Sequence, residues 1–415
     1  MDSSIGVLLI STYFKPDVAS TGMLVAYLAE DLAKLGHKVT VVTSFPHYDI
    51  NYISKGYRQR LFKYEKIDPI NVCRVYTYVP RNRGRLLERM LNYASFNIFS
   101  TLVGTWIGKL YDVILTVSPP LTNGLSASLI SHVHHIPFIY NVQDIYPDIA
   151  IRMGVLTNQW IIELLRRIEQ YIYRQAAALT VISEGFRRNL LAKGVPPDKI
   201  KVIPNFVDTE YIHPLPRYNK FSRKYGLDDK FVVLFAGNIG FSQGLETVIE
   251  AASKLKHQKD VLFLIVGDGA AKPHLIAYTE KLSLQNVRFL PFQPHEIVPE
   301  MYASADVCLV PLRKGFTTES VPSKVLTIAA AGRPLIASVD KGSDTYHFVQ
   351  QSKCGLWVEP EDVEALMEAI MTFYTNRSLC ELLGNNGRKY VETHYARQVI
   401  TRQYAELLEE VAARR

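Results

Sequence analysis

Residues 6–44 read GVLLISTYFKPDVASTGMLVAYLAEDLAKLGHKVTVVTS. The segment from Gly6 to Ser11 is a short continuous apolar run, which is typical of a buried strand in a parallel sheet. Leucines at positions 24, 28, 32 and 35 predict a helix over 23–35 that ends at Gly36. The segment KVTVVTS, residues 38–44, predicts a second strand. Such a strand–helix–strand unit has a right-handed crossover, so this stretch predicts a doubly wound parallel α/β sheet.

The second half of the chain repeats this pattern. It predicts strands at 231–236, 261–266, 287–290, 306–310, 335–337 and 356–358, several of them followed by a glycine turn. A chain of 415 residues is also too long for one ordinary core. We therefore predict two domains, 1–212 and 220–395, joined by the proline-rich segment 213–219.

Composition narrows the class of protein. With 48% hydrophobic and 21% charged residues the chain is globular. The net charge of +7 would suit nucleic acid, anionic lipid or phosphorylated substrates, but no nucleic-acid-binding signature is present. Four scattered cysteines predict neither a metal site nor disulfides, and the first residues do not resemble a signal peptide. Both observations fit a cytoplasmic protein.

A basic cluster precedes a long uncharged segment. Arg81, Arg83, Arg85 and Arg89 are followed by residues 90–108, which carry no charge. The length approaches that of a membrane-spanning helix, but several Asn, Ser and Thr residues favour a helix packed on the sheet. The arginines are either a rim that faces an anionic membrane or a solvated basic surface, and both interpretations stay open.

The segment KGFTTESVPSKVLTIAAAGRP, residues 314–334, predicts a short helix that begins near Ser323 and ends at Gly332. Glu319, Ser323 and Lys324 lie just before or within its first turn. Free N–H groups and the helix dipole favour an anion such as a diphosphate there, although a capped helix with a solvated lysine is the alternative. The turn at Gly22 either allows a similar approach of a phosphate or is an ordinary Rossmann turn, and the dinucleotide fingerprint GxGxxG is absent.

Two carboxylates follow the strand predicted at 136–142. Ligands of open α/β sheets bind at the carboxyl ends of the strands, so we expect Asp144 to meet a substrate hydroxyl. Asp148 is expected to cap the next helix. The loop offers no further oxygen ligands, and we predict no metal.

Four motifs occur in order along nearly the whole chain: VQDIYP at 142–147, PNFVD at 204–208, GNIGFSQGLE at 237–246 and VPSK at 321–324. Together they resemble family 4 retaining glycosyltransferases of the GT-B fold. Within that family they are similar to a branch that transfers amino- or deoxyhexoses in bacterial exopolysaccharide and O-antigen assembly. The resemblance implies two Rossmann-like domains that face a central cleft, with a terminal helix, 396–415, that packs back on the first domain.

The resemblance also implies roles for individual residues. Glu319 would contact the transferred sugar, and Asp144 would lie against it as a second catalytic group. Thr327 stands where the family has a ribose-binding Glu, and Gln143 stands where many members have His. Asn238 and Gln243 replace the Arg and Lys that clamp the diphosphate, so Lys324 is the best compensating charge, with Arg313 and Lys314 in reserve. The donor-binding set is Gly22, Gln143, Asn238, Gln243, Gly267, Pro291, Glu319, Ser323, Lys324 and Thr327.

The predicted function is retaining, metal-independent transfer of a hexose, deoxyhexose or N-acetylaminosugar from a nucleotide-sugar to a lipid-linked glycan acceptor. No cofactor is expected, and a UDP-sugar is favoured over a GDP-sugar. The four arginines would serve the membrane or the acceptor, at the inner face of the cytoplasmic membrane. A nucleotide-sugar 2-epimerase of the same fold and a non-catalytic protein that binds lipid or polyanions are the alternatives.

Overall fold

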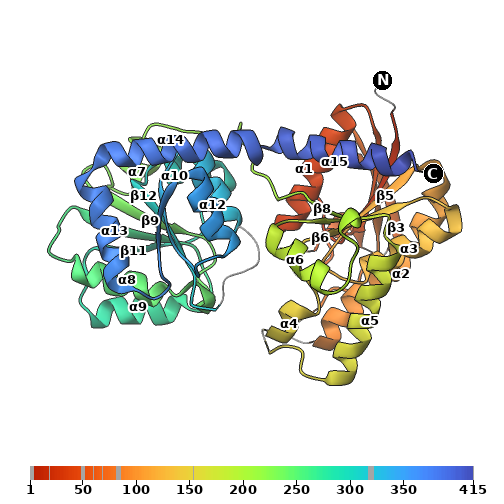
Figure 1. Cartoon of the computed structure of the whole chain (residues 1–415), viewed down its shortest axis with the longest axis horizontal. Helices are drawn as coiled ribbons and strands as arrows, with labels where there is room; N and C mark the ends of the chain where they lie inside the picture. Colours follow the sequence, from red (N-terminus) through yellow and green to blue (C-terminus); the bar gives the residue numbers. More distant parts are fainter. Residues whose placement is uncertain are drawn as a thin grey trace. The chain divides into compact units, whose positions relative to one another are not determined.

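The computed structural model describes residues 4–17, 19–47, 52–58, 60–67, 69–80, 86–152, 154–315 and 322–414. The chain forms two compact units, Met1–Pro204 with Ile400–Arg415, and Asn205–Val399. Each unit is built around its own mostly parallel sheet covered by helices (Figure 1). The prediction of two Rossmann-like α/β domains is therefore confirmed.

The first unit contains an eight-stranded sheet with the order β3-β4-β2-β1-β5-β6-β7-β8. All neighbours pair in parallel except β3 and β4. The strands are β1 Gly6–Ile10, β2 Lys38–Ser44, β3 Phe62–Ile67, β4 Ile70–Val75, β5 Val113–Val117, β6 Phe138–Val142, β7 Ala178–Val181 and β8 Ile200–Val202. The strand order reverses between β1 and β5, which is where such sheets bind ligands.

Helices cover both faces of this sheet because the chain winds in opposite directions from β1. Phe96, Ile130 and Ile172 pack with Leu8 and Ile10 on one face. On the other face, the Asn141 amide donates a hydrogen bond to the hydroxyl of Tyr404 near the C-terminus. The helices are α1 Ser20–Lys34, α2 Leu86–Ile107, α3 Asn123–His134, α4 Asp148–Arg152, α5 Gln159–Gln175, α6 Glu184–Ala192 and α15 Arg397–Ala412.

The second unit has a six-stranded, fully parallel sheet with the order β11-β10-β9-β12-β13-β14. Its strands are β9 Phe231–Ala236, β10 Val261–Val266, β11 Val287–Leu290, β12 Val307–Pro311, β13 Leu335–Ser338 and β14 Gly355–Val358. Apolar clusters lie on both faces of the sheet. The helices are α7 Lys220–Lys224, α8 Leu245–Lys254, α9 Lys272–Lys281, α10 Val298–Ala303, α11 Ser323–Ala330, α12 Asp344–Ser352, α13 Val363–Thr375 and α14 Arg377–His394.

The domain boundary differs from the prediction. The first unit ends at Pro204, and residues 205–212 belong to the second. The reason is packing: Val207 and Ile212 are buried in the second core, and the Val207 N–H donates to the carbonyl of Tyr395 at 3.0 Å. Segment 213–219 is not a free linker either, because Arg217 forms an ion pair with Asp306 at 2.9 Å. At the C-terminus, residues 400–415 join the first unit.

One strand was not predicted from the sequence. Strand β3 is an edge strand whose residues alternate between exposed and half-buried, so it lacks the continuous apolar run of the other strands. The expected terminal helix, 396–415, corresponds to α15, which Tyr395 and Ala396 separate from α14.

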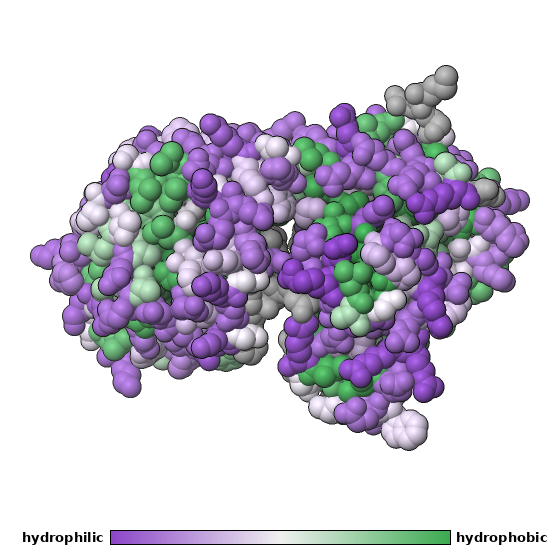
Figure 2. Space-filling model, viewed as in Figure 1, coloured by the Kyte–Doolittle hydropathy of each residue, from purple (hydrophilic) through white to green (hydrophobic). Residues whose placement is uncertain are grey.

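The surface is mixed in polarity. Figure 2 shows a face that is mostly hydrophilic, with apolar residues in separate patches on both units. In the described part of the chain, no helix combines the length and the hydropathy that crossing a bilayer requires.

Candidate functional site

The second sheet reverses its strand order between β9 and β12, and the predicted donor-binding motifs follow these two strands. GNIGFSQGLE follows β9, and α11 follows β12 after the loop that begins at Leu312. The carboxyl ends of adjacent parallel strands lie at one edge of the sheet, so the fold brings the two motifs together.

Glycines allow the backbone to pack closely at this edge. Gly267, after β10, has φ 147°, and a Cβ there would lie 1.9 Å from the carbonyl oxygen of Gly237. Gly269 has φ 155°, and its Cβ would lie 2.4 Å from the Ile239 oxygen. Any side chain would separate the two loops, so glycine is required at both positions.

Lys324 is the charged centre of this edge. Its Nζ donates to Gln243 Oε1 at 2.6 Å and lies 4.2 Å from the centroid of the Phe235 ring. Burial lowers its pKa to about 7. The contact places a cation of α11 beside the neutral Gln243, in the turn that follows β9.

Two more cations lie nearby that the predicted site set does not contain. Lys272 Nζ donates to the carbonyl of Gly267 at 2.9 Å. Arg313 forms an ion pair with Glu246 at 2.9 Å, while its buried Nε has no hydrogen-bond partner. Arg313 was a reserve candidate in the sequence. Lys272 carried no sequence signal, because its proximity to Gly267 comes from the turn between β10 and α9.

Of the other predicted donor-binding residues, two lie at the glycine turns or the helix start, and two lie elsewhere or bond within their own helix. Ser323 is the exposed first residue of α11, and the side chain of Asn238 lies beside Gly240 and Gly269. Thr327, in contrast, donates its hydroxyl to the Ser323 carbonyl at 3.1 Å, within its own helix. Pro291 follows β11, the edge strand, two strands away from β9.

In the first unit, Asp144 is a half-buried carboxylate in the loop after β6. Burial raises its pKa to about 6. Within the described residues its side chain has neither a hydrogen bond nor an ion pair. The backbone is held instead, because Ser118 Oγ accepts hydrogen bonds from the N–H groups of Gln143 at 3.0 Å and Asp144 at 3.5 Å. The Gln143 amide donates to Asn141 Oδ1 at 2.8 Å. An oriented carboxylate without a partner is available to a substrate hydroxyl.

Other predicted residues of this unit lie near the same edge of the sheet. Gly22 is in the first turn of α1, where a Cβ would lie 3.1 Å from the Tyr13 Cβ. Asp148 begins α4 and forms an ion pair with Lys193 at 2.9 Å.

Arg89, on α2, faces tyrosines. Burial lowers its pKa, but a hydrogen bond to Tyr93 and interactions with Tyr146 and Tyr13 more than offset this and raise it overall. Tyr146 belongs to the Asp144 loop. Arg89 therefore interacts with a residue of the Asp144 loop.

Four predicted site residues, Glu319, Arg81, Arg83 and Arg85, lie outside the described residues. Within the described ranges, no group of three or more His, Cys, Asp or Glu residues is arranged to hold a metal ion.

Comparisons with known proteins agree with this geometry. Residues 21–205 match the glycosyl transferase 4-like domain, and residues 218–390 match glycosyl transferases group 1. The chain belongs to the family 4 glycosyltransferases of the GT-B fold. The two matches correspond closely to the two units, so the enzyme class applies to the whole chain.

Individual relatives cover almost all of this glycosyltransferase. WcaI of Escherichia coli (strain K12), described as a colanic acid biosynthesis glycosyl transferase, is 26% identical over 96% of this chain and 98% of its own. Among solved structures, the sucrose-phosphate synthase of Thermosynechococcus elongatus has a TM-score of 0.75 at 18% identity, covering 99% of this chain and 100% of that one. HepE of Anabaena, in complex with UDP, has a TM-score of 0.73 at 16% identity, covering 98% and 100%.

Proposed function

We propose that this glycosyltransferase transfers a hexose, deoxyhexose or N-acetylaminosugar from a nucleotide-sugar to a lipid-linked glycan acceptor in cell-surface polysaccharide synthesis, with retention and without a metal. The observation that carries the proposal is the pairing of Lys324 with Gln243 at the reversal point of the second sheet. That pairing puts an ammonium group beside the glycine turn of a Rossmann-like sheet, where a diphosphate is expected.

The donor is a UDP-sugar in this proposal. Structures of HepE with UDP and with UDP-glucose share the fold of this chain and support that choice. The role in cell-surface polysaccharide synthesis is supported by the colanic acid relative WcaI.

Breaking the bond between the sugar and the diphosphate transfers an electron pair to the leaving oxygen. Lys324, with the positive end of the α11 dipole, stabilises the negative charge that develops there. Contact with the diphosphate costs the protonated Lys324 little further desolvation free energy, because its ammonium group is already buried. The residues Asn238, Ser323 and Gly267 shape the remainder of the donor site.

On the first unit, Asp144 accepts a hydrogen bond from the acceptor hydroxyl. With a pKa of about 6 the carboxylate is mostly ionised at neutral pH. The new bond forms on the face that the diphosphate leaves, and the departing phosphate takes the hydroxyl proton. Glu319 would hold the sugar hydroxyls. Arg81, Arg83 and Arg85 would contact anionic lipid at the inner face of the cytoplasmic membrane, and Arg89 the acceptor.

A binding screen tests the donor assignment. Isothermal titration calorimetry against UDP-, GDP-, ADP- and dTDP-sugars should show binding for a UDP-sugar. Incubation with that donor alone should return it unchanged; formation of its 2-epimer would make the protein an epimerase instead. Absence of binding for all four nucleotides would overturn the donor site.

A further inference from the structure

Helix α2 presents large apolar side chains outward along its whole length. Leu87, Leu91, Ile98, Leu102 and Trp106 are 69%, 46%, 59%, 63% and 75% exposed. Their spacings of four, seven, four and four residues place them on one helical face. We call these five residues the α2 stripe.

The face of α2 that packs on the protein is also partly apolar. It carries buried Asn92, Phe96, Ser100 and Gly104, and the partly buried Phe99, Val103 and Ile107 pack on the same core. A Cβ on Gly104 would lie 2.4 Å from Ile130 Cδ1, so the helix packs closely on α3 at that small residue. Surface helices of soluble proteins normally turn a polar face to the solvent, whereas α2 is apolar on both its inner and its outer face. This arrangement indicates that the outer surface of α2 faces an apolar environment.

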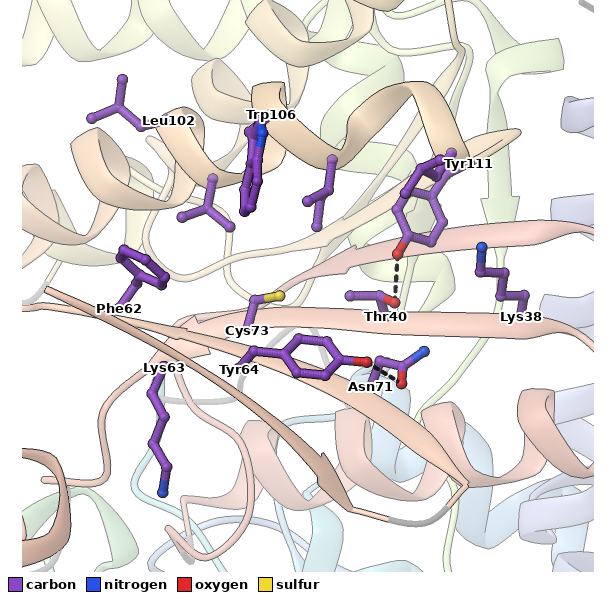
Figure 3. A pocket seen from close by; sticks show the side chains of 13 residues that line it. Lys38, Thr40, Phe62, Lys63, Tyr64, Asn71, Cys73, Leu102, Trp106 and Tyr111 are labelled. Carbon is purple, nitrogen blue, oxygen red and sulfur yellow. Dashed lines mark hydrogen bonds between the residues drawn. The ribbon is translucent and has the colours of Figure 1, made fainter. Parts of the chain in front are cut away.

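A groove of about 530 Å³ opens between the end of α2 and the strands β2, β3 and β4 (Figure 3). Leu102 and Trp106 of the α2 stripe line it, opposite Phe62. Four of its polar lining groups form two hydrogen-bonded pairs: the Tyr64 hydroxyl donates to Asn71 at 2.7 Å, and the Tyr111 hydroxyl donates to Thr40 at 2.5 Å. What the groove offers a ligand is therefore mainly carbon surface.

The groove also has an inert thiol. Burial raises the pKa of Cys73 to about 11, so the thiol remains protonated and unreactive at neutral pH. We therefore expect ligands of this groove to bind without forming a covalent bond to Cys73.

We propose that the α2 stripe is the membrane-docking surface of this glycosyltransferase and that the groove receives an acyl chain of a bilayer lipid. The inference deepens the proposed function, which requires a lipid-linked acceptor, by naming the surface that meets the bilayer. It does not rest on Arg81, Arg83 or Arg85.

The distribution of charged residues around the α2 stripe and the groove indicates that they bind lipid. Between Arg89 and Lys109 the helix carries no charged residue. Lys38 lines the groove, and Lys109 lies next to its lining residue Leu110. Lys63 points away from the groove (Figure 3) and is paired with Glu65 at 3.0 Å. An uncharged apolar surface bordered by lysines matches acyl chains below anionic headgroups. A protein partner would be expected to meet a more polar rim with hydrogen-bonding groups.

Flotation with phosphatidylcholine vesicles that contain phosphatidylglycerol tests the surface. The double variant Leu102→Lys/Trp106→Lys should lose about tenfold or more in vesicle binding. Leu382→Lys, at a leucine that is 57% exposed on α14 of the other unit, is the matched control and should bind as the wild type does. Equal binding of the double variant, or a wild type that does not float, would overturn the proposal.

Quenching by lipids brominated in the acyl chain tests the depth of contact. Quenching of tryptophan fluorescence should disappear in Trp106→Phe and persist in Trp160→Phe.

Sedimentation of the lipid-free protein provides a further outcome: a dimer that Leu102→Lys abolishes would make the α2 stripe an interface between two copies and contradict the proposal. UDP-glucose binding, measured on the same samples, reports separately on the proposed donor site.

Discussion

At the residue scale, Lys324 is the buried cation beside the glycine turn of the second sheet. In this chain Gln243 is neutral, and the cation comes from α11, some eighty residues later in the sequence. Desolvation keeps its pKa near 7. This low pKa follows from burial of the ammonium group, which depends on the fold.

The affinity for UDP-glucose should depend on pH through Lys324. The diphosphate of UDP-glucose is a diester and has no proton that titrates near neutral pH, so the group that titrates belongs to the enzyme. UDP-glucose binds the protonated form of Lys324 more tightly, so binding raises the pKa of this lysine. The affinity is therefore greatest below pH 7, the pKa of Lys324 in the free enzyme. Above pH 7 it should fall by about tenfold for each pH unit, until the pH reaches the pKa of Lys324 in the complex. Calorimetry between pH 6 and pH 9 measures this slope.

The variant Lys324→Met should bind about 10- to 100-fold more weakly at pH 6.5, because it lacks a charge-assisted contact, and its affinity should not change with pH. Lys272→Met is the matched control. It removes a neighbouring cation but should retain the slope. A wild-type slope in Lys324→Met would remove the lysine from the donor site.

Replacing Asp144 should stabilise the protein but reduce its activity. Its pKa of about 6 in the folded protein exceeds the ordinary value of 3.8, so the native state binds the proton more tightly. This contribution to stability is complete below pH 3.8 and is lost as the pH rises through 6. Asp144→Asn should therefore raise the free energy of unfolding by about 1–2 kcal/mol at pH 7.5, with solvent screening taken into account.

Urea denaturation of Asp144→Asn at pH 7.5 and pH 4 checks the sign, because the gain should nearly vanish at the lower pH. Turnover should decrease by about 100-fold or more, since an amide cannot take the role of the carboxylate. A variant that is less stable than the wild type at pH 7.5 would mean that the carboxylate has a stabilising partner.

At the scale of elements, the ends of β9 and β10 decide whether the donor site can form. The glycines after these strands bring two loops into backbone contact that no side chain permits. The same two strands supply much of the second core, so the site and the core are built from one pair of elements.

The substitution Gly267→Ala should destabilise the second unit by about 3 kcal/mol or more, because its Cβ meets a backbone oxygen and its φ is unfavourable. Gly56→Ala is the control, since nothing lies within 4 Å of its Cβ position. Urea denaturation compares the two. A Gly267→Ala protein as stable as the wild type would show that the two loops can separate at little cost.

At the scale of the whole molecule, the enzyme is two units with separate cores, and the chain passes between them twice. Val207 pairs with Ala396 where the two passages meet, and Asp208 forms an ion pair with Arg397 at 3.2 Å. The PNFVD motif therefore fixes the incoming chain against the outgoing one within the second unit.

A nucleotide should stabilise only the unit that binds it. With UDP at about 100 times its dissociation constant, the second unit should gain about 2.7 kcal/mol. Hydrogen exchange measured by mass spectrometry should show protection in peptides that contain residues 237–246 and 322–332. Peptides from the first sheet, such as 113–117, are the internal control. Protection confined to the first unit would place the nucleotide on the other sheet.

Much of the architecture could be predicted from sequence because buried parallel strands are continuous apolar runs and their turns contain glycine. Edge strand β3 escaped prediction because its solvent-facing side interrupts that pattern. The boundary at Pro204 also escaped, since only packing shows that Val207 and Ile212 belong to the second core. Within the candidate site, the sequence predicted roles for Lys324, Gln243 and Asp144 but could not say which of these residues touch.

The sequence by itself determined the two parallel sheets, the position of the motifs at strand ends and the family, because these depend on local periodicity and on residue types at fixed spacings. Tertiary structure alone decided that Lys324 meets Gln243, that the Asp144 side chain has no partner among the residues that the structure describes, and that α2 turns its leucines outward. Each of these depends on which residues distant in the chain become neighbours and on how much water they lose, and no local pattern encodes that.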